Sequence, residues 1–279
     1  CASCHHPDFG WADSRALTIG SDGIGLGPSR FGEQVTPIHS PTIMNTAFTG
    51  LTNEDVSDDF IANGYFWDLR AATLEVQSLG PIKNPVEMLG YEYSAEQILS
   101  VIIQRLKDIE QYPVLFEQAF GTRDINAERI SQALATFERK IISPNTRFDQ
   151  FMAGDIAAFT DDEIAGLNKF IDVGCARCHL GPMLSDNTIH HEQPIITGQA
   201  AVRTPSLRNI IKTAPYMHDG SFATLRDAIA FYEDRDDLEL SMNDDDVGLI
   251  ETFLITLDSD DFYQSQPDYV PSGLAVGGD

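Results

Sequence analysis

The cysteine residues fall into two short motifs, "CASCH" and "CARCH". All four cysteines of the 279-residue chain lie in them, with Cys1 and Cys4 in the first motif and Cys175 and Cys178 in the second. In a C-x-x-C-H pentapeptide the two thiols can add across the vinyl groups of a haem, and the adjacent histidine can ligate the iron. The sequence therefore predicts two covalently bound c-type haems, with His5 and His179 as their proximal ligands.

Paired cysteines also occur in disulfides and in zinc sites, and the two C-x-x-C pairs together could bind one zinc ion. Neither use explains a histidine directly after each pair. Covalent haem attachment predicts an exported, periplasmic protein. The chain starts on a cysteine, so we expect an upstream segment to have been removed or left out. No apolar run approaches the roughly 18 residues that a membrane helix needs.

Segments that follow the first motif resemble segments that follow the second. The similar pairs are "HSPTIMN" (39–45) with "RTPSLRN" (203–209), and "WDLRAATLEVQSLGP" (67–81) with "HDGSFATLRDAIAFY" (218–232). This internal repeat predicts two related haem domains, at 1–150 and 151–279. In the second pair Pro81 stands opposite Tyr232. Proline offers no atom to an iron whereas tyrosine offers a phenol, so one haem is expected to be open and the other to have both axial positions filled.

The sequence between these segments has helical periodicity. Four stretches match amphipathic helices, at 94–111, 126–141, 160–174 and 243–257. Ser94 with Gln97, and Thr160 with Glu163, have the spacing of capping boxes at the start of the first and third stretches. Strand patterns are scarce. The predicted fold is mainly α: two c-type cytochrome domains with long loops and a C-terminal tail that packs back on the body.

Polar residues near Pro81 could take part in chemistry at the open haem. Gln77 and Glu87 stand in an otherwise apolar stretch. A carboxylate beside an open haem could carry a proton while peroxide is cleaved, which is general acid–base catalysis. The alternative interpretation of Glu87 is a solvated glutamate in a loop.

Two longer stretches carry a resemblance to a known family. They are "FWDLRAATLEVQSLGPIKNPVEM" and "RTPSLRNIIKTAPYMHDGSFATL", and together with the two C-x-x-C-H motifs they resemble the bacterial di-haem cytochrome c peroxidase and MauG superfamily. The resemblance covers nearly the whole chain and implies that the first haem reacts with peroxide. It also implies a catalytic role for Glu87 and an electronic bridging role for Trp67. Supporting roles at the open site are implied for Gln77 and Pro81.

The residue at position 232 indicates the subgroup within this resemblance. Cytochrome c peroxidases of the family place a methionine fourteen residues after the "HDG" histidine, whereas MauG-like members place a tyrosine there. Tyr232 has this position here, so the resemblance implies a second haem with histidine and tyrosine ligands. Met217 and Met242 are the rival ligands. An anionic phenolate stabilises oxidised iron, whereas a thioether raises the reduction potential.

The chain departs from the family at three positions. Typical cytochrome c peroxidases cap the resting first haem with a loop histidine, and "GSDGIGLG" at that place has none, so we expect the first haem to be open without reductive activation. Thr213 and Pro215 match carbonyl donors of a calcium ion held between the haems. His39 replaces its asparagine ligand, and because imidazole binds calcium poorly the ion is only a possible cofactor; a packing role for His39 is equally open. Val173 replaces a tryptophan of MauG, so the MauG substrate is not implied.

Charge and one histidine pair bear on partners. The chain carries 18 basic and 43 acidic residues, a net charge of −25. Such a surface repels nucleic acid and anionic lipid and favours a basic protein partner. His190 and His191 follow the second motif in a polar segment, where they could bind a metal or simply be solvated.

These features predict a periplasmic enzyme of MauG type. Hydrogen peroxide reacts at the His5 haem, and oxidising equivalents shared with the second haem oxidise a side chain of a partner protein. The alternative is a cytochrome c peroxidase that reduces peroxide to water with electrons from a small cytochrome. A non-catalytic electron carrier or haem sensor is the third interpretation.

Overall fold

The structure is a computed structural model of the chain, and it describes residues 1–25, 27–49, 64–190, 202–233, 238, 240–274 and 276. In this part of the chain the regular elements are helices, and β pairing is limited to isolated bridges. The mainly α fold is therefore confirmed. None of the described helices is both long and apolar enough to cross a membrane.

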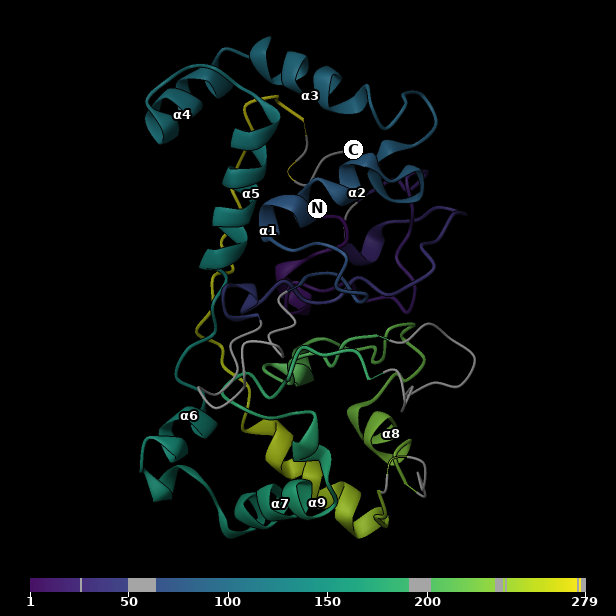
Figure 1. Cartoon of the computed structure of the whole chain (residues 1–279), viewed down its shortest axis with the longest axis vertical. Helices are drawn as coiled ribbons and strands as arrows, with labels where there is room; N and C mark the ends of the chain where they lie inside the picture. The colour runs from purple at the N-terminus through teal and green to yellow at the C-terminus, as the bar shows by residue number, and fades with distance from the viewer. Residues whose placement is uncertain are drawn as a thin grey trace.

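The helices form two groups, one above the other in Figure 1. The upper group is α1 (Leu74–Ser78), α2 (Gly80–Lys83), the π-helix η5 (Pro85–Leu89), α3 (Ile98–Lys107), α4 (Gln111–Phe120) and α5 (Ala127–Lys140). The lower group is α6 (Arg147–Met152), α7 (Asp161–Asp172), α8 (Leu225–Ala230) and α9 (Asp244–Ile255). Short 3-10 turns are η1 (Pro7–Phe9), η2 (Gly27–Ser29), η3 (Thr46–Phe48), η6 (Ile156–Ala158), η7 (Cys175–Arg177) and η8 (Ile210–Lys212). The N-terminal loops lie with the upper group.

Helices α3, α5, α7 and α9 lie in the four stretches with helical periodicity. Helix α7 begins with the predicted capping box, in which Thr160 accepts from the Glu163 amide and the Glu163 carboxylate accepts from the Thr160 amide. Helix α3 begins later than predicted, with Gln97 rather than Ser94 as its N-cap. The Gln97 side chain does accept from the Ser94 amide at 3.3 Å, but residues 95–97 form a turn instead of the first helical turn.

Helices α7 and α9 form the centre of the lower group. Lys169 near the end of α7 pairs with Asp246 at the start of α9, with 2.9 Å between Nζ and Oδ1, so the two helices run antiparallel. Gly166 permits their close approach, because a Cβ at this position would clash with the Leu249 carbonyl group. Phe253 is completely buried in the core that these helices share. This core lies beside the second C-x-x-C-H motif.

The internal repeat has a counterpart in local structure. The side chain of Thr73 caps α1, and the side chain of Thr224 caps α8. The isolated bridges just before these caps correspond as well, as Tyr65 with Ala71 and Tyr216 with Phe222. Pro81 and Tyr232 each follow the capping threonine by eight residues. The two repeats therefore share a frame in which Pro81 and Tyr232 are equivalent.

Two backbone hydrogen bonds join the repeats reciprocally. The His39 amide donates to the His218 carbonyl at 2.8 Å, and the Arg203 amide donates to the Trp67 carbonyl at 2.8 Å. His39 and Arg203 open the first pair of repeated segments, and Trp67 and His218 open the second pair. The halves thus meet through equivalent segments.

Helix α6 crosses the predicted domain boundary at residue 150. Its Phe148 is buried in the core of the lower group, and the Phe148 amide donates to the Thr256 carbonyl at 3.1 Å. This packing favours a boundary before α6, and the division into 1–150 and 151–279 stays a prediction. The tail leaves α9 and runs along α5 toward the upper group (Figure 1), where the Tyr263 ring lies 5.7 Å from that of Phe137.

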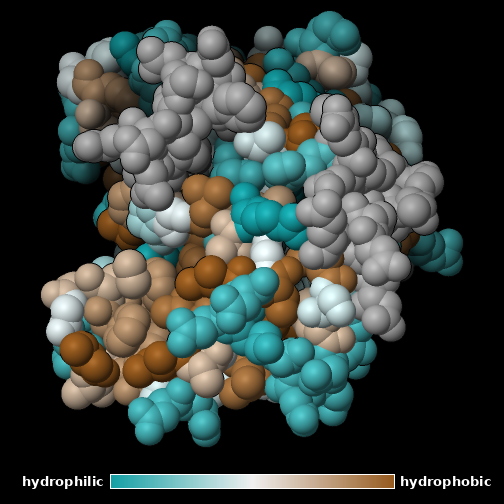
Figure 2. Space-filling model, turned by 60° about the horizontal axis from the view of Figure 1, so that its bottom comes forward, coloured by the Kyte–Doolittle hydropathy of each residue, from teal (hydrophilic) through white to brown (hydrophobic). Residues whose placement is uncertain are grey.

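The face formed by the lower group is mixed in character. Large hydrophobic side chains of this group are exposed at Met152, Ile156, Ile171 and Ile255. Figure 2 brings this end of the molecule forward and shows hydrophobic side chains gathered beside hydrophilic ones. This face therefore presents apolar as well as polar surface.

Candidate functional site

A cavity of about 370 Å³ lies beside the second C-x-x-C-H motif. The motif follows α7 directly and starts with the turn η7. Both cysteines and the histidine of the motif line the cavity. The first half of the chain contributes further lining residues, among them His39 and Trp67. The second half supplies most of the wall, including Arg203, Thr213, Pro215, Met217, His218, Tyr232 and Met242.

The two motif histidines have the same local arrangement. Nδ1 of His179 lies 3.0 Å from the Leu184 carbonyl oxygen, and Nδ1 of His5 lies 3.2 Å from the Trp11 carbonyl oxygen. A carbonyl oxygen only accepts, so each Nδ1 carries the proton and each Nε2 keeps a lone pair, as a metal-bound imidazole requires. Burial lowers the pKa of both rings, that of His5 to about 4, so both imidazoles are neutral.

The first motif is supported by Trp11. This side chain is 5% exposed, and its indole nitrogen donates to the Tyr263 carbonyl of the tail at 2.8 Å. Its ring meets the Phe137 ring of α5 edge-on, with 5.7 Å between the centroids. The carbonyl group that holds His5 is thus fixed by contacts to both α5 and the tail.

Glu87 lies on η5, in electrostatic contact with the first motif. Asn84 caps this helix and donates from Nδ2 to Oε1 of Glu87 at 2.6 Å. Burial raises the pKa of the Glu87 carboxyl, and the Asn84 bond offsets part of the rise. Burial also raises the pKa of the Cys4 thiol, and the charge of Glu87 adds to that rise. Glu87 is therefore half-buried near Cys4, and its solvated-loop interpretation loses support.

Gln77 and Pro81 lie on the helices next to η5. Gln77 belongs to α1 and Pro81 to α2, and both are half-buried. Helix α2 packs against both α1 and η5. The Phe66 ring closes the space beside Gly80, because a Cβ there would lie 2.8 Å from it. The structure thus gathers the predicted residues of the open site in one region, and their roles stay predictions.

Trp67 is fixed between the two halves. Its side chain is 7% exposed and lines the cavity beside the second motif. The indole nitrogen donates to the His39 carbonyl at 3.0 Å, and the ring meets the His218 ring edge-on at 6.4 Å. Its carbonyl accepts from Arg203. Hydrogen bonds to both halves therefore hold Trp67 where the sequence predicts a bridge between the haems.

Three candidate axial ligands line the cavity beside the second motif. Tyr232 follows α8, where its amide donates to the Ile229 carbonyl at 3.0 Å, and it packs against the buried core. Met242 belongs to that core and is 8% exposed. Met217 lies in a turn with a φ of 71°. All three residues border the same space, so ligation by Tyr232 stays a prediction.

The residues of the predicted calcium site lie on the wall of the same cavity. Thr213 and Pro215 are there together with His39, which is 4% exposed. Nδ1 of His39 lies 2.9 Å from the Arg15 carbonyl oxygen, so this nitrogen is a donor and not a metal ligand. Burial lowers the pKa of the His39 imidazole. His39 thus binds the Arg15 carbonyl through its imidazole and the His218 carbonyl of the second half through its amide, and calcium binding stays a prediction.

The cysteines form neither of the alternative sites considered for them. None of the four is in a disulfide. Among the described residues the metal-ligand cluster that occurs joins Cys178 with Asp186 and His190, and it includes no cysteine of the first pair. In this cluster His190 Nε2 lies 2.8 Å from Asp186 Oδ2, while His191 lies outside the described residues. A zinc site shared by both pairs is therefore wrong for the described structure.

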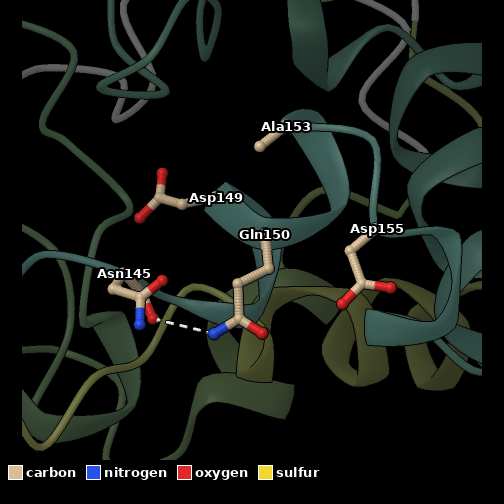
Figure 3. A pocket seen from close by; sticks show the side chains of 5 residues that line it. All are labelled: Asn145, Asp149, Gln150, Ala153 and Asp155. Atoms are coloured by element: carbon tan, nitrogen blue, oxygen red, sulfur yellow. Dashed lines mark hydrogen bonds between the residues drawn. The ribbon is translucent and has the colours of Figure 1, made fainter.

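A separate depression lies at α6 (Figure 3), and no residue of either motif lines it. It is lined by Asn145, Asp149, Gln150, Ala153 and Asp155. Asp149 pairs with Arg208 at 2.8 Å and also caps its own helix. Asp155 accepts from the Ala157 amide at the start of η6. Both carboxylates serve the local fold, and we assign this depression no chemistry.

Sequence reasoning missed Arg203 and Asn84. The Arg203 guanidinium lines the cavity and donates to the Phe66 carbonyl at 3.0 Å and to Asn187 Oδ1 at 3.1 Å. Burial lowers its pKa to about 10, and it forms no ion pair with another described residue. Arg203 is the first residue of the repeated segment 203–209, and this position could have identified it from the sequence. For Asn84 the signal was that Pro85 follows it directly, two residues before Glu87, because an Asn-Pro pair is typical of a helix start.

Comparisons with known proteins agree with this arrangement. A family model described as di-haem cytochrome c peroxidase matches residues 1–157. The cytochrome c551 peroxidase of Nitrosomonas europaea is 32% identical over 287 residues, which cover 96% of this chain and 75% of that protein. The methylamine utilization protein MauG of Methylophilus methylotrophus is 32% identical over 250 residues, which cover 84% of this chain and 66% of that protein.

Solved structures show the same fold. A MauG-like protein associated with microbial copper homeostasis matches with a TM-score of 0.73 at 24% identity, over 93% of this chain and 83% of that one. The diheme peroxidase BthA of Burkholderia thailandensis matches with a TM-score of 0.65 at 20% identity, over 98% and 84%. The chain belongs to the di-haem cytochrome c peroxidase family. It is an oxidoreductase of the di-haem peroxidase type, whose family carries two haem groups.

The residues of both halves fit a haem. The cavity beside the second motif is bordered by the thiols of Cys175 and Cys178, the neutral imidazole of His179 and the guanidinium of Arg203. This guanidinium can bind a haem propionate. In the first half Nε of Arg30 is buried without a hydrogen-bond partner among the described residues. The charge of this guanidinium acts on the Cys4 thiol, where it offsets part of the rise in pKa that burial causes. A propionate beside the first motif would satisfy the Arg30 donor.

Proposed function

We propose that the protein is a MauG-like enzyme that uses hydrogen peroxide at its first haem to oxidise a side chain of a partner protein. The observation that carries this proposal is a difference between two equivalent positions. Pro81 and Tyr232 each follow a helix-capping threonine by eight residues, one in each repeat. With haems bound, Pro81 would offer no ligand to the first iron, whereas the Tyr232 phenolate would be able to ligate the second iron and would favour its oxidised states.

The first site contributes acid–base chemistry to the reaction of peroxide. A haem held by Cys1, Cys4 and His5 supplies the open iron position and the electrons for cleavage of the O–O bond. Glu87 accepts a proton from one peroxide oxygen and returns it to the oxygen that leaves as water. The raised pKa of its carboxyl, which burial causes, suits this double role. The Asn84 bond at 2.6 Å holds Oε1 of Glu87 in a fixed direction.

Trp67 carries electrons between the two sites. The residue belongs to the first half by sequence, yet its ring lines the cavity of the second half. The hydrogen bond from its indole nitrogen to the His39 carbonyl fixes the ring, so little reorganisation accompanies electron transfer. Indole is also one of the more easily oxidised side chains. These features support a bridging role.

The thiols of both motifs attach the haems covalently, with the neutral His5 and His179 as proximal ligands. Covalent attachment of this kind implies export to the periplasm. The net charge of −25 favours a basic protein as the partner, because opposite charges steer the encounter. The MauG substrate itself is not proposed, since Val173 stands where MauG has a tryptophan on the route to that substrate.

A cytochrome c peroxidase is the second candidate function. Two observations favour it: the 32% identity to a cytochrome c551 peroxidase over nearly the whole chain, and the two methionines, Met217 and Met242, on the wall of the second cavity. In this case a small cytochrome supplies two electrons, and peroxide is reduced to water.

One experiment separates the two functions. The diferric holoprotein is mixed with hydrogen peroxide, and its absorption spectrum is followed with and without a reduced small cytochrome. A MauG-like enzyme reacts at once in the diferric state and shows spectral changes at both haems without the cytochrome. A protein that reacts only after partial reduction, or only while cytochrome is consumed, is instead a cytochrome c peroxidase.

A further inference from the structure

A row of aromatic rings leads from the first motif to the surface. The Trp11 carbonyl binds the His5 ring, and the Trp11 ring meets that of Phe137 at 5.7 Å. Phe137 meets Tyr263 at 5.7 Å, with the rings nearly perpendicular. Tyr263 is 37% exposed, and its carbonyl also accepts the hydrogen bond from the Trp11 indole. Trp11 and Tyr263 are therefore connected both through a hydrogen bond and through an intervening ring.

Side chains from both halves of the chain hold the tail that carries Tyr263. Phe262 packs in the buried cluster of Trp11, Met44 and Ile141. Lys212 pairs with Asp260 at 2.7 Å just before this point. The tyrosine is thus held beside Trp11, although 252 positions separate the two residues in the chain.

We propose that Trp11 and Tyr263 form a one-electron relay from the first haem site to the surface, on a route separate from Trp67. The relay rests on the proposed function, because hydrogen peroxide is its oxidant. Peroxide takes up two electrons and two protons to give two molecules of water. The relay supplies these two electrons one at a time. In each transfer one electron moves from Trp11 to the haem site. An electron from Tyr263 then replaces it, and the phenolic proton of Tyr263 goes to solvent.

The neutral phenoxyl left on Tyr263 is restored by an electron from a small reductant in solution and a proton from water. Lys140 lies beside the last residue of the relay, with its ammonium group 5.5 Å from the centre of the Tyr263 ring. A cation at this distance opposes a positive charge on the ring. Loss of the phenolic proton with the electron avoids that charge, so Lys140 favours proton-coupled oxidation of Tyr263. The relay gives the oxidising equivalents an exit to a surface residue when no protein partner is bound.

The test mixes the holoprotein with hydrogen peroxide alone, freezes it rapidly and records the electron paramagnetic resonance spectrum. Oxidised residues are then mapped by peptide mass spectrometry. The relay predicts a tyrosyl radical and oxidation products at Tyr263. Tyr263→Phe abolishes this radical, and Trp11→Phe abolishes it while Tyr263 is still present. Tyr269→Phe is the matched control, because Tyr269 also lies in the tail and is 70% exposed, and it leaves the radical unchanged.

Peroxide consumption in the same mixture separates this proposal from the proposed function. If peroxide is consumed and the radical persists in Tyr263→Phe, the relay is wrong and the proposed function stands. If the diferric holoprotein does not consume peroxide, the proposed function and the relay both fail. As a further readout, ferrocyanide added as the small reductant quenches the radical in the native protein. Ferrocyanide that is oxidised at the same rate by native protein and Tyr263→Phe would also contradict the relay.

Discussion

The indole nitrogen of Trp67 donates a hydrogen bond of 3.0 Å to the backbone carbonyl of His39. His39 in turn donates its amide to the His218 carbonyl at 2.8 Å, so one residue links the bridging ring to the second half. The His39 imidazole adds a third bond, to the Arg15 carbonyl. In this chain a network of protein hydrogen bonds holds the junction between the two sites together.

Replacing Trp67 with phenylalanine tests this junction. The variant keeps an aromatic ring but loses the bond to His39, whose buried carbonyl is left unpaired, and we expect the free energy of unfolding to fall by about 1–3 kcal/mol. Peroxide should still react at the first haem, while the spectral response of the second haem is delayed. Stopped-flow absorption and chemical denaturation measure the two effects. An unchanged response of the second haem would exclude Trp67 as the bridge.

Covalent attachment predicts a simple result in mass spectrometry. The intact chain, denatured and reduced, should carry the mass of two haems. Changing both Cys175 and Cys178 to alanine should remove one haem and leave the one attached at the first motif. A native chain that loses both haems on denaturation, or that retains zinc instead, would show that the C-x-x-C pairs have a different use.

Glu87→Gln tests the proton carrier. Glutamine keeps the shape and can still bond to Asn84, but it cannot accept a proton, so the resting spectra should be nearly unchanged. The peroxide reaction should slow by about 10²–10⁴-fold, the usual contribution of a general acid–base group. Glu92→Gln is the matched control, because Glu92 is exposed just after η5 and should react as the native protein does. A native rate in Glu87→Gln would remove this residue from the mechanism.

The half-buried Glu138 on α5 predicts a pH-dependent stability. Burial raises its pKa from 4.5 to about 7. The folded state therefore binds this proton more tightly than the unfolded state, and the associated stability is lost as the pH rises from 4.5 through 7. Glu138→Gln should raise the melting temperature of the holoprotein at pH 8 and change it less at pH 5. Glu128→Gln, at an exposed position of the same helix, is the control. A stabilisation that is equal at both pH values would contradict this assignment.

The parts of the fold that depend on local sequence were predictable. The Thr160 and Glu163 capping box needs only the spacing of two residues, and the structure contains it. The C-x-x-C-H motifs are local as well. The equivalence of Pro81 and Tyr232 also follows from local spacing, because each follows a helix-capping threonine by eight residues.

The parts that depend on distant contacts were not predictable. The internal repeat predicted two domains that meet at residue 150, yet α6 packs with the second half through Phe148. The contact of Trp11 with Tyr263 joins positions 252 apart, and no local pattern encodes such a contact. Hydrogen bonding by His39 depends on a carbonyl of the other half and is equally invisible in the sequence.

The central claim, an open first haem beside a tyrosine-ligated second haem, is tested most directly by Tyr232→Phe. The measurement is the electron paramagnetic resonance spectrum of the resting diferric holoprotein, native and variant. The native protein should show one high-spin haem without prior reduction and one low-spin haem. In the variant, which keeps the ring but lacks the phenolic oxygen, the low-spin signal should disappear or change to that of a new ligand. A native spectrum with two low-spin haems, or a low-spin signal that survives unchanged in Tyr232→Phe, would contradict the account, and the latter would direct attention to Met217 and Met242.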